Sequence, residues 1–243
     1  MRIVCSDINI FKSSFEAISK IVNEIQMEID SDGLRVNAID PSHTTFVNLD
    51  IKEIEFDIFE CEKPRSIFFN TDEFLKYLKR INKDSLLEIK VDENYLIIHS
   101  EGSTNKTFKL KLMENDYTVP SLPQIDYEME FEISTKLFKE ICNDIVEFSP
   151  RMKISNDGNF IRFIAFGDFT DAEIEYIYQN KVTEKYSAVY DMNKIKDMMK
   201  ADKFATKTYI HYGNDMPVLI EMKSENENQC LNFILAPRIE EDI

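Results

Sequence analysis

Two stretches of sequence decide the fold: FKSSFEAISKIVNEI at residues 11–25 and STKLFKEICNDIVEF at residues 134–148. In both, apolar residues recur at the three- and four-residue spacing of an amphipathic helix. At an offset of 123, the matching positions are Phe15, Ile18 and Val22 in the first stretch and Phe138, Ile141 and Ile145 in the second. The pair therefore predicts an internal duplication, with an equivalent helix near the start of each half.

Further landmarks recur in the same order along the two halves. Asp32-Gly33 and Asp157-Gly158 each follow an alternating run, a pattern that predicts a β-hairpin. Each half then has a second helical stripe, followed by strand-like segments at 86–100 and 208–222. Amphipathic helices resemble one another in any protein, but four landmarks in one order favour duplication. The predicted helices are 9–24, 71–83, 135–148 and 191–203.

This organisation predicts an α+β protein of two similar domains, each with two helices packed on antiparallel sheet. We expect the domains at 1–113 and 128–243, joined by a connector at 114–127. Pro120 and Pro123 disfavour ladder hydrogen bonds and favour an extended connector. Its apolar residues predict that the connector lies against the surface or takes part in binding.

Composition places the chain among packed proteins, because 43% of its 243 residues are hydrophobic. It has neither the long uncharged apolar run of a membrane span nor the pattern of a signal peptide. The four cysteines stand far apart without a C-x-x-C pair, which favours reduced thiols. We therefore expect a cytoplasmic protein with no membrane partner.

The net charge of −16 argues against nucleic acid as a partner, because phosphate attracts Lys and Arg. The charge is segregated, however: the predicted helices carry net +2 and the rest of the chain −18. Lys76, Lys79, Arg80 and Lys83 share one helical face, and Lys196, Lys200 and Lys203 repeat the stripe in the second half. A single such stripe is ordinarily a solvated face. Two at equivalent places favour sequence-independent contact with phosphates.

Sequence patterns of catalysis are absent. The chain has no P-loop and no dinucleotide-binding glycine motif, and its three histidines lack metal-ligand spacing. His43 favours a turn or a surface contact, because no nucleophile stands beside it. We therefore expect no enzyme activity, no metal site and no cofactor. Two alternatives remain open: a Mg²⁺-dependent nuclease that uses the acidic clusters, and an acidic scaffold that binds only proteins.

Several motifs resemble the proliferating cell nuclear antigen (PCNA) family of DNA polymerase sliding clamps, in its archaeal form. The matching segments are DGLRV at 32–36, AIDPSH at 38–43, FLK at 74–76, NDMP at 214–217 and FILAPRIE at 233–240. The last is highly specific, and the order and spacing extend the likeness over essentially the whole chain. Thr44 and Phe46 stand where the family usually has other aliphatic residues, which affects the expected shape of a partner pocket.

The resemblance implies the clamp fold and a ring of three subunits around double-stranded DNA, bound without sequence preference. It leaves open a homotrimer or one member of a heterotrimer. The implied partners are a clamp loader of the replication factor C type and, through short hydrophobic motifs, DNA polymerase, flap endonuclease and DNA ligase. If the chain is archaeal, it would be associated with the nucleoid. The cations expected to face DNA are Lys12, Lys76, Lys79, Arg80, Lys83, Lys139, Lys196, Lys200 and Lys203.

The resemblance also implies two protein interfaces. Ring closure would pair edge strands at 106–113 and 171–178, and the expected contact residues are Phe108, Lys109, Leu110, Lys111, Glu173, Ile174, Glu175 and Tyr176. The expected pocket for client motifs comprises Ile39, Thr44, Phe46, Leu122, Ile125, Pro217, Ile234, Leu235, Ala236 and Pro237. Some of these residues could equally be ordinary core, Leu235 above all.

Overall fold

The structure is a computed structural model that describes residues 1–114, 118 and 120–239. Its elements recur in nearly the same order in the two halves. The first half comprises β1 (Arg2–Cys5), α1 (Asn9–Ile18), β2 (Glu24–Ile29), β3 (Gly33–Ile39), β4 (Thr45–Lys52), η1 (Glu53–Glu55), β5 (Ile58–Glu60), β6 (Arg65–Asn70), α2 (Thr71–Leu78), β7 (Leu86–Asp92), β8 (Tyr95–Glu101) and β9 (Lys106–Lys111). The second half comprises β10 (Met129–Ser134), α3 (Thr135–Val146), β11 (Arg151–Ala165), β12 (Ala172–Val182), β13 (Ser187–Asp191), α4 (Met192–Met198), η2 (Met199–Ala201), β14 (Lys207–Tyr212), β15 (Val218–Lys223) and β16 (Gln229–Leu235).

In the part of the chain that the structure describes, the four α-helices are all shorter than their apolar patterns predict. Three of them begin directly after a residue whose side chain caps the helix. Asn70, Ser134 and Asp191 each accept a hydrogen bond from a backbone N–H in the first turn of α2, α3 and α4. α1 ends at Ile18, and a turn leads from there into β2. Val22 is buried but lies beyond the helix, so its match to a helical position is wrong. Apolar spacing continued past the helix because the turn packs on the same core.

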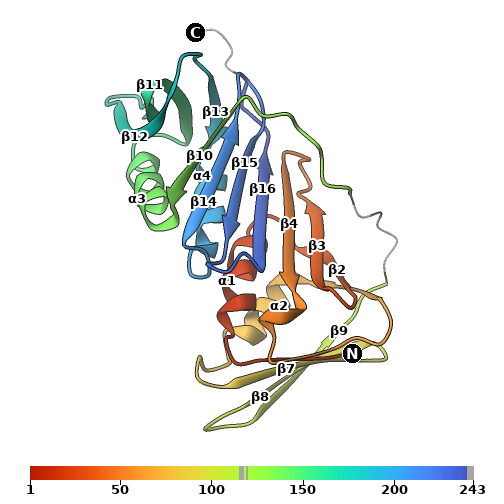
Figure 1. The fold of residues 1–243 in the computed structure, drawn as a ribbon. Coiled ribbons are helices and arrows are strands. Elements are labelled where there is room, and N and C mark those ends of the chain that lie inside the picture. The colour runs from red at the N-terminus through yellow and green to blue at the C-terminus, as the bar shows by residue number, and fades with distance from the viewer. Residues whose placement is uncertain (115–117, 119, 240–243) are drawn as a thin grey trace.

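The strands of the described residues form three antiparallel sheets (Figure 1). The largest is eight-stranded, in the order β10-β14-β15-β16-β4-β3-β2-β6. It crosses from one half of the chain to the other where β16 pairs with β4, from Gln229 opposite Ile51 to Leu235 opposite Thr45. The two halves therefore share one continuous sheet. The flanking sheets are β5-β1-β7-β8-β9 and β12-β11-β13.

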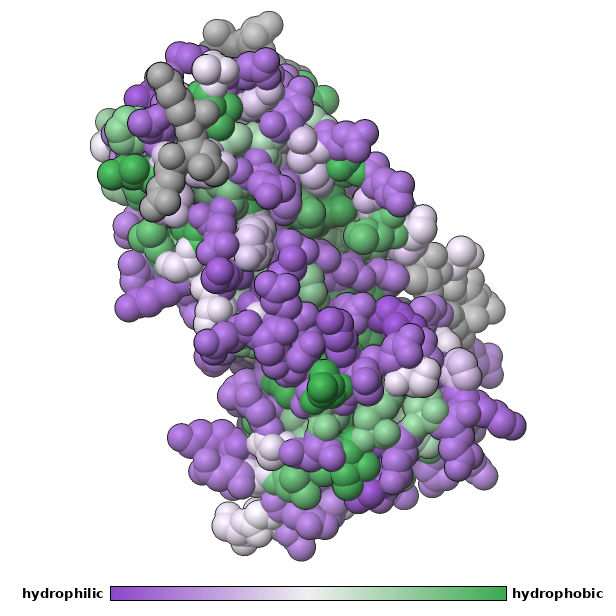
Figure 2. Space-filling model, in the orientation of Figure 1, coloured by the Kyte–Doolittle hydropathy of each residue, from purple (hydrophilic) through white to green (hydrophobic). Residues whose placement is uncertain are grey.

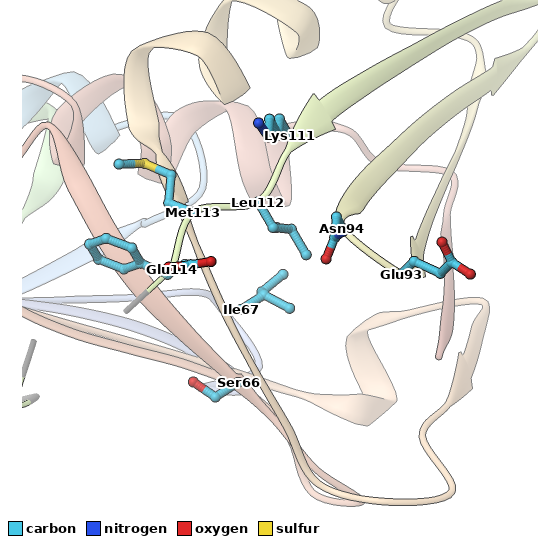
Figure 3. A pocket seen from close by; sticks show the side chains of 9 residues that line it. Ser66, Ile67, Glu93, Asn94, Lys111, Leu112, Met113 and Glu114 are labelled. Carbon is cyan, nitrogen blue, oxygen red and sulfur yellow. The ribbon is translucent and has the colours of Figure 1, made fainter. Parts of the chain in front are cut away.

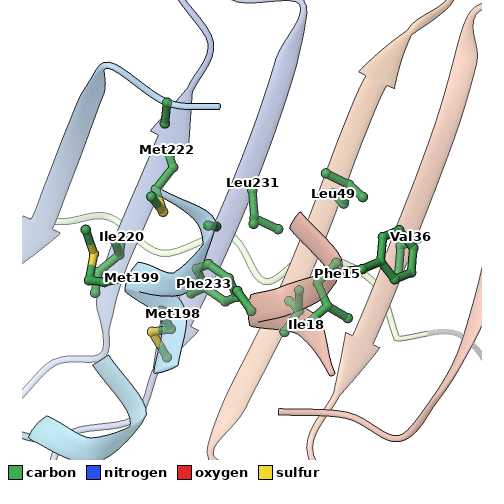
Figure 4. Packing of buried hydrophobic residues seen from close by; sticks show 14 of the residues in the cluster. Phe15, Ile18, Val36, Leu49, Met198, Met199, Ile220, Met222, Leu231 and Phe233 are labelled. Carbon is green, nitrogen blue, oxygen red and sulfur yellow. The ribbon is translucent and has the colours of Figure 1, made fainter. Parts of the chain in front are cut away.

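The helices cover one face of the shared sheet and build a common core with it. Figure 4 shows Phe15 and Ile18 of α1 between Val36 of β3 and Phe233 of β16, with Met198 and Met199 on the far side of Phe233. These side chains belong to one buried hydrophobic cluster that spans both halves. The predicted arrangement of two helices on antiparallel sheet in each half is therefore confirmed.

The two predicted Asp-Gly turns differ. The first joins β2 to β3, and Gly33 there has φ +147, a value that favours glycine. The second lies within β11 rather than between two strands, so the prediction of two separate strands there is wrong. Gly158 has φ +66, and the ladder of β11 shifts register between Gly158 and Phe160. The chain bends at this glycine because the first part of β11 pairs with β13 and the second with β12.

Equivalent ion pairs correct the offset between the halves. Arg35 pairs with Asp30 beside the first turn, and Arg162 pairs with Asp157 beside the second, with 3.5 Å between Nη1 of Arg162 and Oδ2 of Asp157. Both members recur 127 residues later, rather than the 123 suggested by the apolar pattern of the first helix in each half. At this offset Lys12 of α1 corresponds to Lys139 of α3.

Figure 2 shows that hydrophilic residues cover most of one face, with smaller hydrophobic patches between them. The four cysteines are all free. Within the described ranges, no helix is long and apolar enough to cross a membrane. In the same residues, no three His, Cys, Asp or Glu side chains are grouped as a metal ion would require.

Candidate nucleic-acid and protein interfaces

The predicted DNA-facing cations lie on the helices and on the turns that follow them. Their side chains are exposed or half-buried, on faces turned away from the buried stripe of each helix. Several pair with a carboxylate: Lys76 with Glu73 at 3.2 Å, Lys139 with Asp202 at 2.8 Å, Lys203 with Glu16 at 3.8 Å, and Lys200 with Asp197. The helical surface therefore carries charges of both signs, and DNA phosphates would compete with these carboxylates for the lysines.

The structure adds cations that the lysine stripes did not indicate. Lys20, in the turn after α1, and Lys136, in the first turn of α3, are both exposed. Neither belongs to the i, i+3, i+4 stripes from which the sequence prediction was made. The signal that could have found Lys136 is its position on the same helix as Lys139.

Lys194 does not belong to this surface, because it joins the two halves of the chain. Its Nζ lies 2.8 Å from Oδ2 of Asp40 and 3.1 Å from Oγ1 of Thr45, and also donates to Thr44. Burial alone would raise the pKa of Asp40, but hydrogen bonds from Lys194, Ser42 and two backbone N–H groups outweigh it. Together they lower the pKa from 3.8 to about 2.

This ion pair predicts an acid-labile contribution to stability. A depressed carboxyl pKa stabilises the folded chain above about pH 4, and that contribution is lost as the pH falls towards about 2. We expect Lys194→Met to lower the free energy of unfolding by about 2 kcal/mol near neutral pH. In urea titrations, the difference from the unchanged protein should shrink progressively below about pH 4. A difference independent of pH would show that the lost packing of Lys194, not its charge, matters.

The predicted client pocket is only partly assembled from the expected residues. Ile39, Phe46 and Ile234 lie side by side on the face of the shared sheet opposite the helices, on strands β3, β4 and β16. Phe46 and Ile234 are nearly covered, with exposed fractions of 5% and 7%. Leu235 points to the other side and belongs to the core, so its predicted place in the pocket is wrong. Side chains alternate along a strand, which separates Ile234 from Leu235.

This outer apolar row continues onto residues that sequence reasoning missed. Leu219 of β15 stands opposite Ile234, and His211 of β14 stands opposite Leu219. The ring of Tyr127 packs on His211, with 5.6 Å between centroids. Burial raises the pKa of Tyr127 to about 12. The only sequence signal for Tyr127 was its place at the end of an apolar connector.

Thr44, Pro217 and Ala236 each lie two residues along the chain from a member of this row. Thr44 lies in the loop before β4, and the N–H of Ala236 donates to its carbonyl oxygen at 2.8 Å. Pro217, Ala236 and Pro237 are half-buried. In the connector Ile125 is half-buried, whereas Leu122 is 46% exposed. A cavity of about 360 Å³ opens nearby, beside Ile39 and the loop at 40–43.

The predicted ring-closing strands both stand at sheet edges. β9 ends the five-stranded sheet, and β12 ends the three-stranded sheet. Phe108 and Leu110 of β9 turn towards the core, while Lys109 and Lys111 turn outwards. Phe108 also stacks on Tyr77 of α2, with 5.0 Å between ring centroids, beside a cavity of about 360 Å³. Tyr77 is a second aromatic at this edge that the sequence pattern did not indicate.

On β12 the predicted contacts divide between inner and outer faces. Tyr176 turns inwards and donates its hydroxyl proton to the carbonyl oxygen of Glu132 at 3.1 Å. Glu173 and Glu175 face outwards, but both lie close to Arg162, with Nε to carboxylate distances of 3.3 and 3.0 Å. Their charge is therefore partly neutralised within the chain. Ile177, 70% exposed, is an outward residue missing from the prediction.

Comparison with solved structures places this architecture in the class of the DNA clamp fold. The PCNA2–PCNA3 complex from Sulfolobus tokodaii superimposes with a TM-score of 0.91 at 21% identity, covering 99% of this chain and 100% of that chain. PCNA from Thermococcus kodakaraensis gives a TM-score of 0.90 at 22% identity, covering 98% of this chain and 99% of that chain.

Sequence comparison is more specific. Residues 3–119 match the family of proliferating cell nuclear antigen N-terminal domains, and residues 121–238 match the corresponding family of C-terminal domains. The DNA polymerase sliding clamp of Methanothermobacter thermautotrophicus is 41% identical over 97% of this chain and 96% of its own length. That of Methanobrevibacter smithii is 36% identical over 98% and 97%.

The chain therefore belongs to the proliferating cell nuclear antigen family. Its function is that of a sliding clamp, which confers processivity on DNA replication. The nuclease and scaffold alternatives are not favoured by these matches.

Proposed function

We propose that three copies of the chain close into a ring by pairing β9 of each copy with β12 of the next. One observation carries this proposal: β9 and β12 occupy, in the duplicated halves, the places that β16 and β4 occupy at the junction within the chain. The second pair is joined by a full antiparallel ladder, while the first pair is left at free edges, and unpaired edges readily pair with another chain. A native mass of three times 28.6 kDa is expected, and a monomer at all concentrations would refute the ring.

In this proposal the helices line the hole and the lysines on them face the phosphates of double-stranded DNA. An acidic exterior with locally basic helices disfavours contact from outside while it admits a duplex within. The domains at 1–113 and 128–243 would then be the two arms of each subunit, joined by the connector at 114–127. We assign no catalytic step to the chain, and clamp opening to a separate loader of the replication factor C type.

Charge reversal on β9 should weaken the ring. Lys109→Glu with Lys111→Glu places two carboxylates against the acidic edge at Asp171 and Glu173, and like charges on neighbouring strands are destabilising. Because Arg162 already partly neutralises Glu173, we expect a modest loss, about 0.5 to 1 kcal/mol for each altered contact. Light scattering over a dilution series at low salt measures it. Reversal of Lys63, exposed in the loop before β6, is the control, and equal stability of both variants would count against this edge.

We further propose that client proteins, including DNA polymerase, flap endonuclease and DNA ligase, place a short hydrophobic motif between the connector and the outer apolar row. Support comes from the apolar row on the sheet face away from the helices and from the connector, whose Tyr127 packs on His211 at the end of that row. Leu122 of the same connector is exposed. An apolar motif gains free energy by covering such residues. The site of action would be the cytoplasm, at the nucleoid.

Leu122→Ala should weaken client binding without altering the fold, because its side chain contributes little to the core. We expect about a fivefold to tenfold loss of affinity for a motif peptide, from burial of one leucine. Calorimetry with a synthetic client peptide measures this change. Leu86→Ala, which removes an exposed leucine on β7, should leave the affinity unchanged. Equal affinities of the two variants would place the motif elsewhere.

A further inference from the structure

Two features beside the ring-closing strands have no partner within the described chain. Phe169, in the loop between β11 and β12, is 100% exposed. At the end of β9 lies a cavity of about 660 Å³, lined by residues 66–68 of β6, the turn at 93–94 and residues 111–114 (Figure 3). A fully exposed aromatic side chain and an unfilled cavity at the edge of a sheet are each typical of a protein interface.

The duplication shows how these features relate. Ala38 pairs with Val47 across β3 and β4, and Ala165 pairs with Ala172 across β11 and β12. β3 and the second part of β11 are equivalent, because their hairpin ion pairs recur together. Positions in β4 therefore recur 125 residues later in β12, as Val47 and Ala172 do.

β9 and β16 are related by the same offset of 125 residues. The N–H of Met113, just after β9, donates to the carbonyl oxygen of Phe68 at 2.8 Å. The N–H of Arg238, just after β16, donates to the carbonyl oxygen of Val189 at 2.7 Å. Met113 and Arg238 are 125 residues apart, so positions in β9 recur 125 residues later in β16.

These two offsets predict the register of the β9–β12 junction between copies from that of the β16–β4 ladder within the chain. At the β16–β4 junction, the N–H of Ala236 donates to the carbonyl oxygen of Thr44 and so extends the ladder. The equivalent of Ala236 is Lys111, and the equivalent of Thr44 is Phe169. An antiparallel junction built on this template sets Phe169 of one copy opposite Lys111 of the next.

The faces of the strands agree with this register. It places Phe108 opposite Ala172, and both side chains turn towards the core. It also places Lys109 opposite Asp171, and both are exposed on the outer face. Opposite charges thus meet directly across the junction, which a shift by one residue would prevent.

We propose that Phe169 of one copy seats in the cavity beside β9 of the next copy and anchors the junction, an inference that rests on the ring proposed above. The apolar part of the cavity comprises Ile67, Phe68, Leu112 and Met113, and Figure 3 shows Leu112 and Ile67 close together in it. The ammonium group of Lys111 stands where it can approach the ring face, an arrangement that attracts a cation. The contact reaches Glu114, so ring closure holds the first residues of the connector.

Disulfide trapping tests the register. Lys111→Cys with Phe169→Cys, in a chain that also carries Cys61→Ser and Cys230→Ser, should form covalent dimers and closed rings under mild oxidation. Opposed residues of an antiparallel pair are about 4.5 to 5.5 Å apart at Cα, within the reach of a disulfide. The matched control is Lys111→Cys with Thr170→Cys, shifted by one residue to the other face, which should trap far less.

Fluorescence tests the burial of the anchor, since the chain has no tryptophan. Phe169→Trp should emit at shorter wavelength in the assembled ring and shift to longer wavelength on dilution. Phe166→Trp, in the same loop, should change little. Phe169→Ala should raise the apparent dissociation constant about tenfold for each junction. A stable trimer without the Lys111–Phe169 disulfide, or with Phe169→Trp still exposed to water, would overturn the anchor and leave the ring intact. Absence of any trimer in the unchanged protein would overturn both.

Discussion

Replacement of Lys76, Lys79, Lys196 and Lys200 by alanine is expected to lower processive DNA synthesis at least about tenfold near physiological salt. Each copy gives up four positive charges on its helices, so a ring of three neutralises far fewer phosphates. The slope of log affinity against log salt should fall by about 0.9 for each phosphate that is no longer neutralised. Primer extension on a long template and salt titration of DNA binding measure the two effects.

The matched control removes the same charge from outside the helices. Lys52, Lys63, Lys207 and Lys223 lie on strands or loops, and their replacement by alanine should leave DNA synthesis close to that of the unchanged protein. Both variants should remain trimeric in light scattering. If both lose activity equally, net charge matters rather than its place, and the helices do not line the hole.

Phe233→Ala is expected to have the largest effect on stability, about 3 to 5 kcal/mol. Phe233 is completely buried on β16, where it lies opposite Val47 of β4 and Ile220 of β15. Its loss would leave a cavity between the shared sheet and the helices of both halves. Chemical denaturation should show both halves unfolding together at a lower denaturant concentration.

Phe148→Ala is the control, because that ring is 44% exposed after α3 and its removal opens no cavity in the shared core. We expect a loss below about 1 kcal/mol from this substitution. Two separate transitions in Phe233→Ala would show that the halves are independent folding units, despite the ladder that joins them.

Local periodicity predicted the elements well, and failed where a contact between distant segments decides the outcome. The stripes containing Phe15 and Phe138 correctly located helices, because an amphipathic stripe must face a core. Val22 continued the stripe but belongs to a turn. Asp157-Gly158 has the composition of a hairpin, yet lies within β11 because that strand changes partner there.

The candidate interfaces likewise divide into those carried by a single helix, which the sequence reveals, and those built from distant segments, which it does not. Lysine stripes are visible in the sequence because they follow one helix. The outer apolar row is not, because Phe46, Ile234 and Leu219 come from three strands whose register no local pattern fixes. Lys194 illustrates the point most clearly: it stands beside a lysine stripe in sequence, but its partner Asp40 is 154 residues away. Such pairs follow from topology alone.

A closed ring of three such chains would have six strand-pairing junctions, three within chains (β16 with β4) and three between chains (β9 with β12). The two kinds share one strand arrangement but differ in stability. At the junction within each chain, Lys194 holds Asp40, and the amide of Asn232 donates to that of Asn48 at 3.0 Å.

At the junction between chains, the duplication puts Glu73, Thr107 and Glu173 at the places of Lys194, Asn232 and Asn48. Glu73 has no ammonium group to offer, the Thr107 hydroxyl already bonds His99, and Glu173 already pairs with Arg162. The junction between chains therefore lacks the reinforcing bonds of the junction within each chain and is the weaker of the two. Mechanical force on the ring would part it there, and the ring would open between intact subunits.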